Sequence, residues 1–117
     1  MPTPSTPDGD SERWREIVAA GEAIQSWVSG LDEAAYLADD RTSAAVAMYL
    51  IVIGEAAGRL SAEAKQATAL PWAQISALRN RIAHGYETVD HQLVWQILQE
   101  DLPALSDAVD RLLISRP

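Results

Sequence analysis

Apolar residues recur at steps of three and four along most of this 117-residue chain. No segment shows the alternation of apolar and polar residues that indicates a β-strand. Glycines and prolines lie mostly between the periodic segments, where such residues end helices. The pattern therefore predicts an all-α bundle of four or five helices. The expected helices cover residues 11–29, 31–37, 41–66, 71–84 and 89–114.

The helix ends have recognisable signals. Ser11 is a plausible N-cap for the first helix, and Asp39-Asp40 can cap the third. Thr88 and Asp90 are the candidate caps of the last helix, which Pro103 should kink or split because its ring clashes with the preceding turn. Gly30 should end the first helix.

The third expected helix is apolar at nearly every position over residues 44–53. A helix that is apolar all round is buried all round, so one face can meet the core while another meets a second subunit. The alternative is a central core helix without a dimer. The small residues at 54 and 56–58 form a patch that another helix could approach closely. Glu55, in their midst, needs a partner if it is buried, and we expect an arginine or a helix end.

The length fits one domain, with residues 1–10 as a disordered Pro/Ser/Thr-rich tail and residues 11–117 as the helical domain. The chain has no cysteine, which leaves no disulfide or thiolate metal site. The N-terminus lacks the pattern of a signal peptide, and the longest apolar run is well short of the roughly 20 residues that cross a membrane. A cytoplasmic protein with no membrane contact is the expectation.

The formal net charge is −8, from 9 basic and 17 acidic side chains. This argues against broad nucleic-acid binding, which usually has a basic footprint. A local basic site is still compatible with it. Arg79 and Arg81 lie close together in sequence, and Arg59 and Lys65 could join them in the fold.

Residues 79–86 concentrate more chemistry than any other stretch, with the sequence Arg-Asn-Arg-Ile-Ala-His-Gly-Tyr. The preceding helix should end at Gly85, because glycine tolerates the left-handed conformation just past a last turn. Five residues correspond to about 500° of helical rotation, so Arg79 and His84 do not share a face. They converge only if the helix end unwinds or a second copy of the motif faces the first, which favours a dimer.

These residue types suit work on a phosphate without a metal. Arginine presents a planar fork of donors to phosphate oxygens, and histidine transfers protons near neutral pH. RNA carries its own nucleophile, the 2′-hydroxyl, so His84 and Arg79 would suffice for cleavage to a 2′,3′-cyclic phosphate and a 5′-hydroxyl. DNA should resist this route, and no cofactor or metal is needed. The structural alternative is that both side chains simply meet the negative end of the helix dipole.

The stretch from Arg79 to His84 resembles the Arg-x4-His motif of the HEPN superfamily, including the polar residue after the arginine. Tyr86 extends it to the Arg-x4-His-x-Tyr signature of HepT-like toxins. Flanking matches are Ile53-Gly54-Glu55-Ala56-Ala57, Arg59-Leu60-Ser61, Pro71-Trp72, Val89-Asp90, Val94-Trp95 and Asp101-Leu102-Pro103. The resemblance spans residues 12–114 and implies a HEPN-type homodimer with both motifs in one composite cleft.

The resemblance further implies a metal-independent endoribonuclease toxin of a type VII-like toxin–antitoxin pair, acting on RNA such as tRNA or mRNA. Its partner would be an MNT-type nucleotidyltransferase antitoxin, which silences the toxin by transferring AMP to Tyr86. Added phosphates there would occupy the anion site and repel RNA. The competing interpretations are a non-catalytic HEPN module that binds nucleotide or protein, and a purely structural helical dimer.

The resemblance assigns roles to four residues of the motif. Arg79 would bind and polarise the scissile phosphate, and His84 would act as general base or acid. Asn80 would orient the phosphate or the imidazole. Tyr86 would be the modification site and would contact substrate. From its residue type alone, we add Arg81 as a contact to the RNA backbone.

Overall fold

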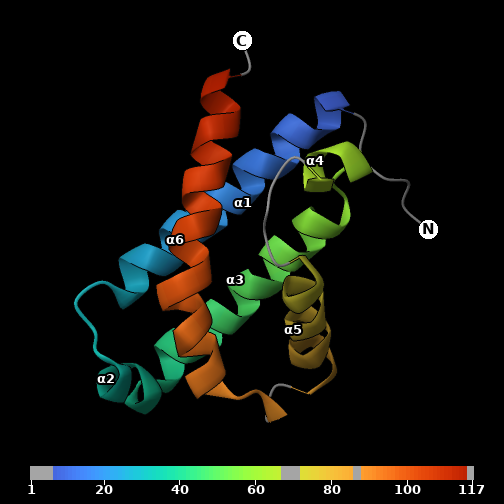
Figure 1. Cartoon of the computed structure of the whole chain (residues 1–117). Coiled ribbons are helices and arrows are strands. Elements are labelled where there is room, and N and C mark those ends of the chain that lie inside the picture. Colours follow the sequence, from blue (N-terminus) through green and yellow to red (C-terminus); the bar gives the residue numbers. More distant parts are fainter. Residues whose placement is uncertain (1–6, 67–71, 86–87, 116–117) are drawn as a thin grey trace.

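The computed structural model describes residues 7–66, 72–85 and 88–115 (Figure 1). Its helices are α1 (Pro7–Val28), α2 (Glu33–Ala38), α3 (Asp40–Gly58), α4 (Ala62–Gln66), α5 (Trp72–His84) and α6 (His91–Ser115). There is no strand in these three ranges. The all-α class is confirmed, and the described residues hold six helices, not four or five, because the long third helix is broken.

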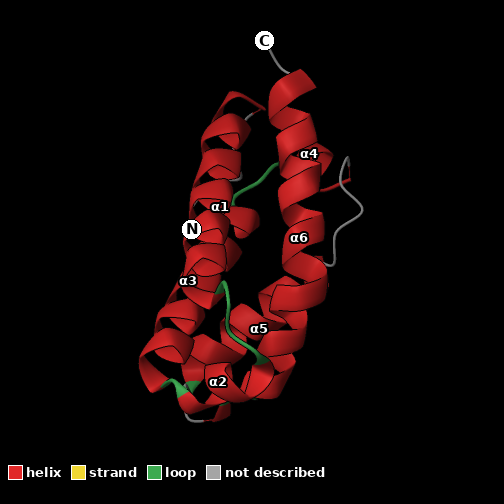
Figure 2. Ribbon diagram, turned by 90° about the vertical axis from the view of Figure 1, so that its left-hand side faces the viewer, coloured by secondary structure: helices red, strands yellow, loops and turns green. Residues whose placement is uncertain are grey.

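The three longest helices, α1, α3 and α6, form the body of the bundle, in which α1 packs against both α3 and α6 (Figure 2). α5 packs on α3, and α2 bridges the ends of α3 and α6. The core is apolar and draws on α1, α2, α3, α5 and α6, with Trp14, Ile17, Ile24, Tyr36, Val46, Leu50, Ile53, Ile82, Val94, Leu98 and Leu102 all buried. α3 therefore contributes to the core and also packs against α5, the helix that carries the motif.

The predicted continuous helix over residues 41–66 is wrong: α3 ends at Gly58 and α4 begins at Ala62. Ser61 causes the second start, because its Oγ accepts the backbone N–H of Ala64 (3.1 Å) as an N-cap does. The N–H and Oγ–H of Ser61 both donate to the carboxylate of Asp10, with 2.8 Å for the N–H. A contact between residues 51 positions apart therefore stabilises the break.

The same contact corrects the predicted N-terminal tail. α1 begins at Pro7, so Ser11 lies inside the helix and is not its cap. Asp10, expected in the disordered tail, is only 1% exposed and is bonded to Ser61. Residues 1–6 of that predicted tail lie outside the described residues.

Other predicted helix ends are confirmed. Gly30 follows α1 with a φ of +82°, the left-handed conformation that glycine tolerates. Asp39 caps α3 by accepting the N–H of Thr42 (3.0 Å). This backbone hydrogen bond, with a smaller contribution from the Thr42 hydroxyl, lowers the pKa of Asp39 below its usual value.

The last helix begins as one of the two predicted caps implies. Asp90 accepts the N–H groups of Gln92 and Leu93 and so caps α6, whereas Thr88 does not. α6 is one continuous helix through Pro103, so the predicted split does not occur. The proline lies thirteen residues into a helix whose earlier turns pack on the core through Val94 and Leu98.

The apolar stretch of α3 is not buried on all sides in a single chain. Met48 is 58% exposed and Val52 is 39% exposed, although Val46, Leu50 and Ile53 are in the core. Residues 48 and 52 are one turn apart and share a face. One apolar face of α3 is therefore open on the single chain.

Candidate active site

The motif occupies the C-terminal turns of α5, which ends at His84 as predicted. Gly85 follows, but it does not have the left-handed conformation that we expected, since Gly30 alone has a positive φ among the described glycines. A Cβ at Gly85 would lie 3.3 Å from Oγ1 of Thr88, whose hydroxyl donates to the Gly85 carbonyl (2.7 Å). Close approach of Thr88, not backbone handedness, favours glycine at this position.

Arg79 is held from two sides. One Nη atom donates to the carboxylate of Glu55 on α3, and the other donates to Oδ1 of Asn80 (2.9 Å). The side chains of Arg79 and Glu55 are 34% and 45% exposed, so the pair stays accessible to solvent and to a ligand. The expected pairing of Glu55 with an arginine is confirmed, although Glu55 is exposed and not buried. Asn80 contacts the guanidinium itself.

Gly54 allows this arrangement. An ideal Cβ built on Gly54 would lie 2.7 Å from both Cβ and Cγ of Arg79. Only a residue without a side chain lets α5 approach α3 this closely. The small-residue patch therefore does receive another helix, and that helix is α5 of the same chain.

A cleft of about 310 Å³ lies between α3 and α5. Its lining residues are Gly54, Glu55, Gly58 and Arg59 from the end of α3, and Ser76, Arg79 and Asn80 from α5. Arg59 thus joins Arg79 as the sequence suggested, whereas Lys65 is not among the lining residues. Ser76 was not predicted, although its spacing of three and four residues from Arg79 and Asn80 places it on their face of α5.

The remaining motif residues lie elsewhere. His84 and Arg81 are exposed and do not line the cleft that holds Arg79. This agrees with the large rotation between positions 79 and 84 along the helix. Tyr86, the expected modification site, lies outside the described residues. A single chain therefore presents the arginine and the histidine at separate places.

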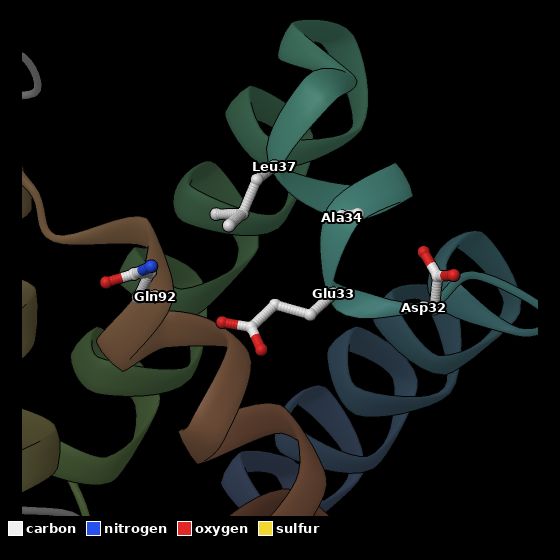
Figure 3. A pocket seen from close by; sticks show the side chains of 5 residues that line it. All are labelled: Asp32, Glu33, Ala34, Leu37 and Gln92. Atoms are coloured by element: carbon white, nitrogen blue, oxygen red, sulfur yellow. The ribbon is translucent and has the colours of Figure 1, made fainter.

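A second depression lies between α2 and the start of α6 (Figure 3). It is lined by Asp32, Glu33, Ala34, Leu37 and Gln92, and the side chains of Glu33 and Leu37 extend from α2 toward the space beside α6. Two carboxylates and no cation would repel a phosphate. This depression is therefore not a site for RNA.

Among residues 7–66, 72–85 and 88–115, no helix combines the length and apolar character required to cross a bilayer. No group of three or more His, Cys, Asp or Glu side chains is placed to hold a metal ion in those parts. Of the two depressions described above, the cleft beside Arg79 is the one lined by arginine side chains.

Comparison with known proteins places the chain in a family. The family model described as "Ribonuclease HepT-like" matches residues 11–112. The chain is 29% identical over 98 residues to "Probable ribonuclease HepT" of Thermococcus cleftensis, covering 83% of this chain and 89% of that one. It is 26% identical over 98 residues to a provisionally named RNase of Caldanaerobacter subterraneus, covering 83% and 88%. No solved structure matches. With a family match over nearly its whole length, the chain belongs to the HepT-like ribonuclease family.

Proposed function

We propose that this chain is a metal-independent endoribonuclease that cuts RNA through attack of the substrate's own 2′-hydroxyl. The observation that carries the proposal is Arg79, held by Glu55 and Asn80 in an accessible cleft, in a chain of the HepT-like ribonuclease family. The names of the relatives as ribonucleases support the same activity.

The reaction needs two kinds of group. The 2′-oxygen attacks the adjacent phosphorus, and the bond from phosphorus to the 5′-oxygen of the next nucleotide breaks. His84 accepts the proton of the 2′-hydroxyl or returns one to the leaving 5′-oxygen. Arg79 stabilises the charge on the phosphate oxygens in the transition state, and Asn80 keeps the guanidinium oriented. The products are a 2′,3′-cyclic phosphate and a 5′-hydroxyl.

A homodimer would bring the separated groups together. Met48 and Val52 form an exposed apolar stripe on α3 that leads toward Glu55 on the same helix. Burial of this stripe against a second copy would place the two clefts near each other and supply His84 of one chain to Arg79 of the other. Met48→Glu should then produce a monomer without cleavage in size-exclusion light scattering and RNA assays. The matched control is Leu93→Glu, at an exposed leucine of α6, which should stay dimeric.

Regulation would act at Tyr86. We assign the partner as an MNT-type nucleotidyltransferase antitoxin in a cytoplasmic type VII-like toxin–antitoxin pair. The phenol oxygen would attack the α-phosphorus of ATP, pyrophosphate would leave, and the phenolic proton would pass to solvent. The added phosphate, two residues beyond His84 in sequence, would compete with RNA for the arginines. tRNA and mRNA are the substrate candidates.

The decisive assay is RNA cleavage in EDTA by protein whose intact mass shows no modification. Wild type should cleave RNA and leave DNA of the same sequence intact, while Arg79→Ala and His84→Ala should lose about 10²-fold or more in rate. His91→Gln provides the control, because it removes the other histidine of the chain. Cleavage that survives His84→Ala would overturn the proposal.

The second candidate function is a non-catalytic HEPN module that binds nucleotide or protein. The observations that favour it are the net charge of −8 and the pairing of Arg79 with Glu55 in the isolated chain. It predicts RNA or nucleotide binding without cleavage by the unmodified wild type.

The remaining interpretation is a purely structural helical dimer. It predicts that Arg79→Ala changes neither stability nor phenotype.

A further inference from the structure

Two arginines from different helices line the cleft between α3 and α5. Arg59 is the C-cap residue of α3, and Arg79 lies on α5. The lining residues include one carboxylate, Glu55, so two positive charges minus one negative charge leave the cleft at +1. In a chain of net charge −8, this is a local basic site.

The two cations differ in their present partners. Glu55 pairs with Arg79, and no ion pair among the described residues engages Arg59. Glutamate four residues before an arginine is the favourable order for a pair along a helix, yet Glu55 faces α5 instead. Arg59 is therefore the cation of the cleft that a ligand can reach without displacing a carboxylate.

Both arginines face the same small space. The stem of Arg79 lies against Gly54, and Arg59 is the C-cap residue that follows Gly58 at the end of α3. Because both line one cleft of about 310 Å³, a strand whose scissile phosphate lies at Arg79 brings its neighbouring phosphate close to Arg59. The floor between them is open, because a Cβ at Gly58 would meet nothing within 4 Å.

We propose that Arg59 binds the phosphate next to the scissile one, so that this cleft holds two consecutive phosphates of a single-stranded RNA. The assignment rests on the proposed ribonuclease function, which gives the scissile phosphate to Arg79. Ser76 and Asn80 line the α5 side of the cleft, and their side chains can donate hydrogen bonds to the phosphate oxygens of the RNA. The cleft is small, about 310 Å³, and the flexible backbone of a single strand can bend into such a space.

The test is binding of a short single-stranded RNA, measured by fluorescence anisotropy over a series of salt concentrations in the His84→Ala background. Arg59→Gln should weaken binding about tenfold. It should also reduce the slope of log affinity against log salt by about 0.7, the value for one lost phosphate contact in a single strand. Arg59→Lys should keep the slope. Arg41→Gln, at the far end of α3, is the control for charge alone and should change neither quantity.

A second measurement identifies the phosphate. A single neutral methylphosphonate linkage is moved along the RNA, one linkage at a time. In the protein that retains Arg59, a methylphosphonate at either of two adjacent linkages should weaken binding. In Arg59→Gln, only one of these two linkages should remain sensitive. Equal sensitivity of both proteins at every linkage would overturn the assignment, even if Arg59→Gln were less stable.

Parallel cleavage assays with the unmodified chain keep the two proposals apart. If the wild type cleaves RNA and Arg59→Gln keeps the salt slope and the linkage pattern, Arg59 is not a phosphate ligand and the ribonuclease proposal stands. If the wild type does not cleave, the ribonuclease proposal fails. In that case the salt slope and the linkage pattern still show, independently of cleavage, whether Arg59 is a phosphate ligand.

Discussion

Gly54→Ala is the most informative single change, because it acts where the helix of the motif meets the core. The added methyl would lie 2.7 Å from both Cβ and Cγ of Arg79. These atoms are at the base of the side chain, and the position of Cβ is fixed by the backbone of α5, so rotation of the distal guanidinium does not relieve the contact. α5 or Arg79 must move. Gly58, one turn later on α3, has open space for the same methyl and is the matched control.

Two opposing contributions decide how much each substitution changes the free energy of unfolding. Replacing glycine by alanine within a helix stabilises by about 0.5–1 kcal/mol. Crowding a packed contact costs about 1–3 kcal/mol. Gly58→Ala has only the first term, with less than its full value because Gly58 is the last residue of α3. Gly54→Ala has both, with the full helix term, so the two variants should differ by the crowding cost less that excess, about 0.5–2.5 kcal/mol, with Gly54→Ala the less stable.

The assay is urea and thermal unfolding followed by circular dichroism. For a chain of this length, each kcal/mol corresponds to roughly 4 °C in Tm, so the two variants should separate by roughly 2–10 °C. Folded Gly54→Ala should also cleave RNA up to about 10²-fold more slowly, because Arg79 is displaced from its working position. Equal or greater stability of Gly54→Ala relative to Gly58→Ala would refute the close approach of α5 to α3.

Three further changes test separate parts of the structure. Glu55→Gln should lower KM in the cleavage assay, because the carboxylate no longer competes with phosphate for Arg79. Its Tm should stay close to that of wild type, since exposed ion pairs contribute about 1 kcal/mol or less to stability. A raised KM would contradict this. Asp10→Ala should cost about 1.5–3 kcal/mol in urea unfolding, because the N–H and hydroxyl of Ser61 lose a buried charged acceptor; an unchanged midpoint would show that this contact is unimportant. The bond from Thr42 lowers the pKa of Asp39 in the folded state below the usual 3.8, so its stabilisation is complete above that pH and is lost as pH falls through the lower folded value. Asp39→Asn should therefore flatten the dependence of Tm on pH below 3.8, and an unchanged slope would argue against the cap.

The parts of the fold that the sequence predicted are those controlled by nearby residues. The caps Asp39 and Asp90, the turn at Gly30 and the end of α5 at His84 all depend on contacts within a few positions. The all-α class follows from helical periodicity in the same way. These features need no knowledge of how the helices meet.

Two of the failures depend on one contact between distant segments. The break before α4 and the early start of α1 both depend on the bond between Asp10 and Ser61, which no local pattern indicates. Pro103 does not split α6, which is packed on the core through its earlier turns.

The candidate site was predictable in its residue types but not in its grouping. The sequence indicated Arg79 and the need of Glu55 for a partner, and their pairing across two helices follows. It did not indicate that Asn80 contacts the guanidinium, or that Ser76 lines the cleft. His84 lies away from the cleft that holds Arg79, and the proposed homodimer would bring the two together.

The proposed attack of the 2′-hydroxyl leaves a chemical signature on the RNA fragments. Mass spectrometry of the fragment ends, after digestion in EDTA by unmodified protein, detects it. We expect 2′,3′-cyclic phosphate and 5′-hydroxyl ends from wild type and intact RNA from His84→Ala. Fragments with 5′-phosphate and 3′-hydroxyl ends would instead indicate attack by water and would refute the proposed mechanism.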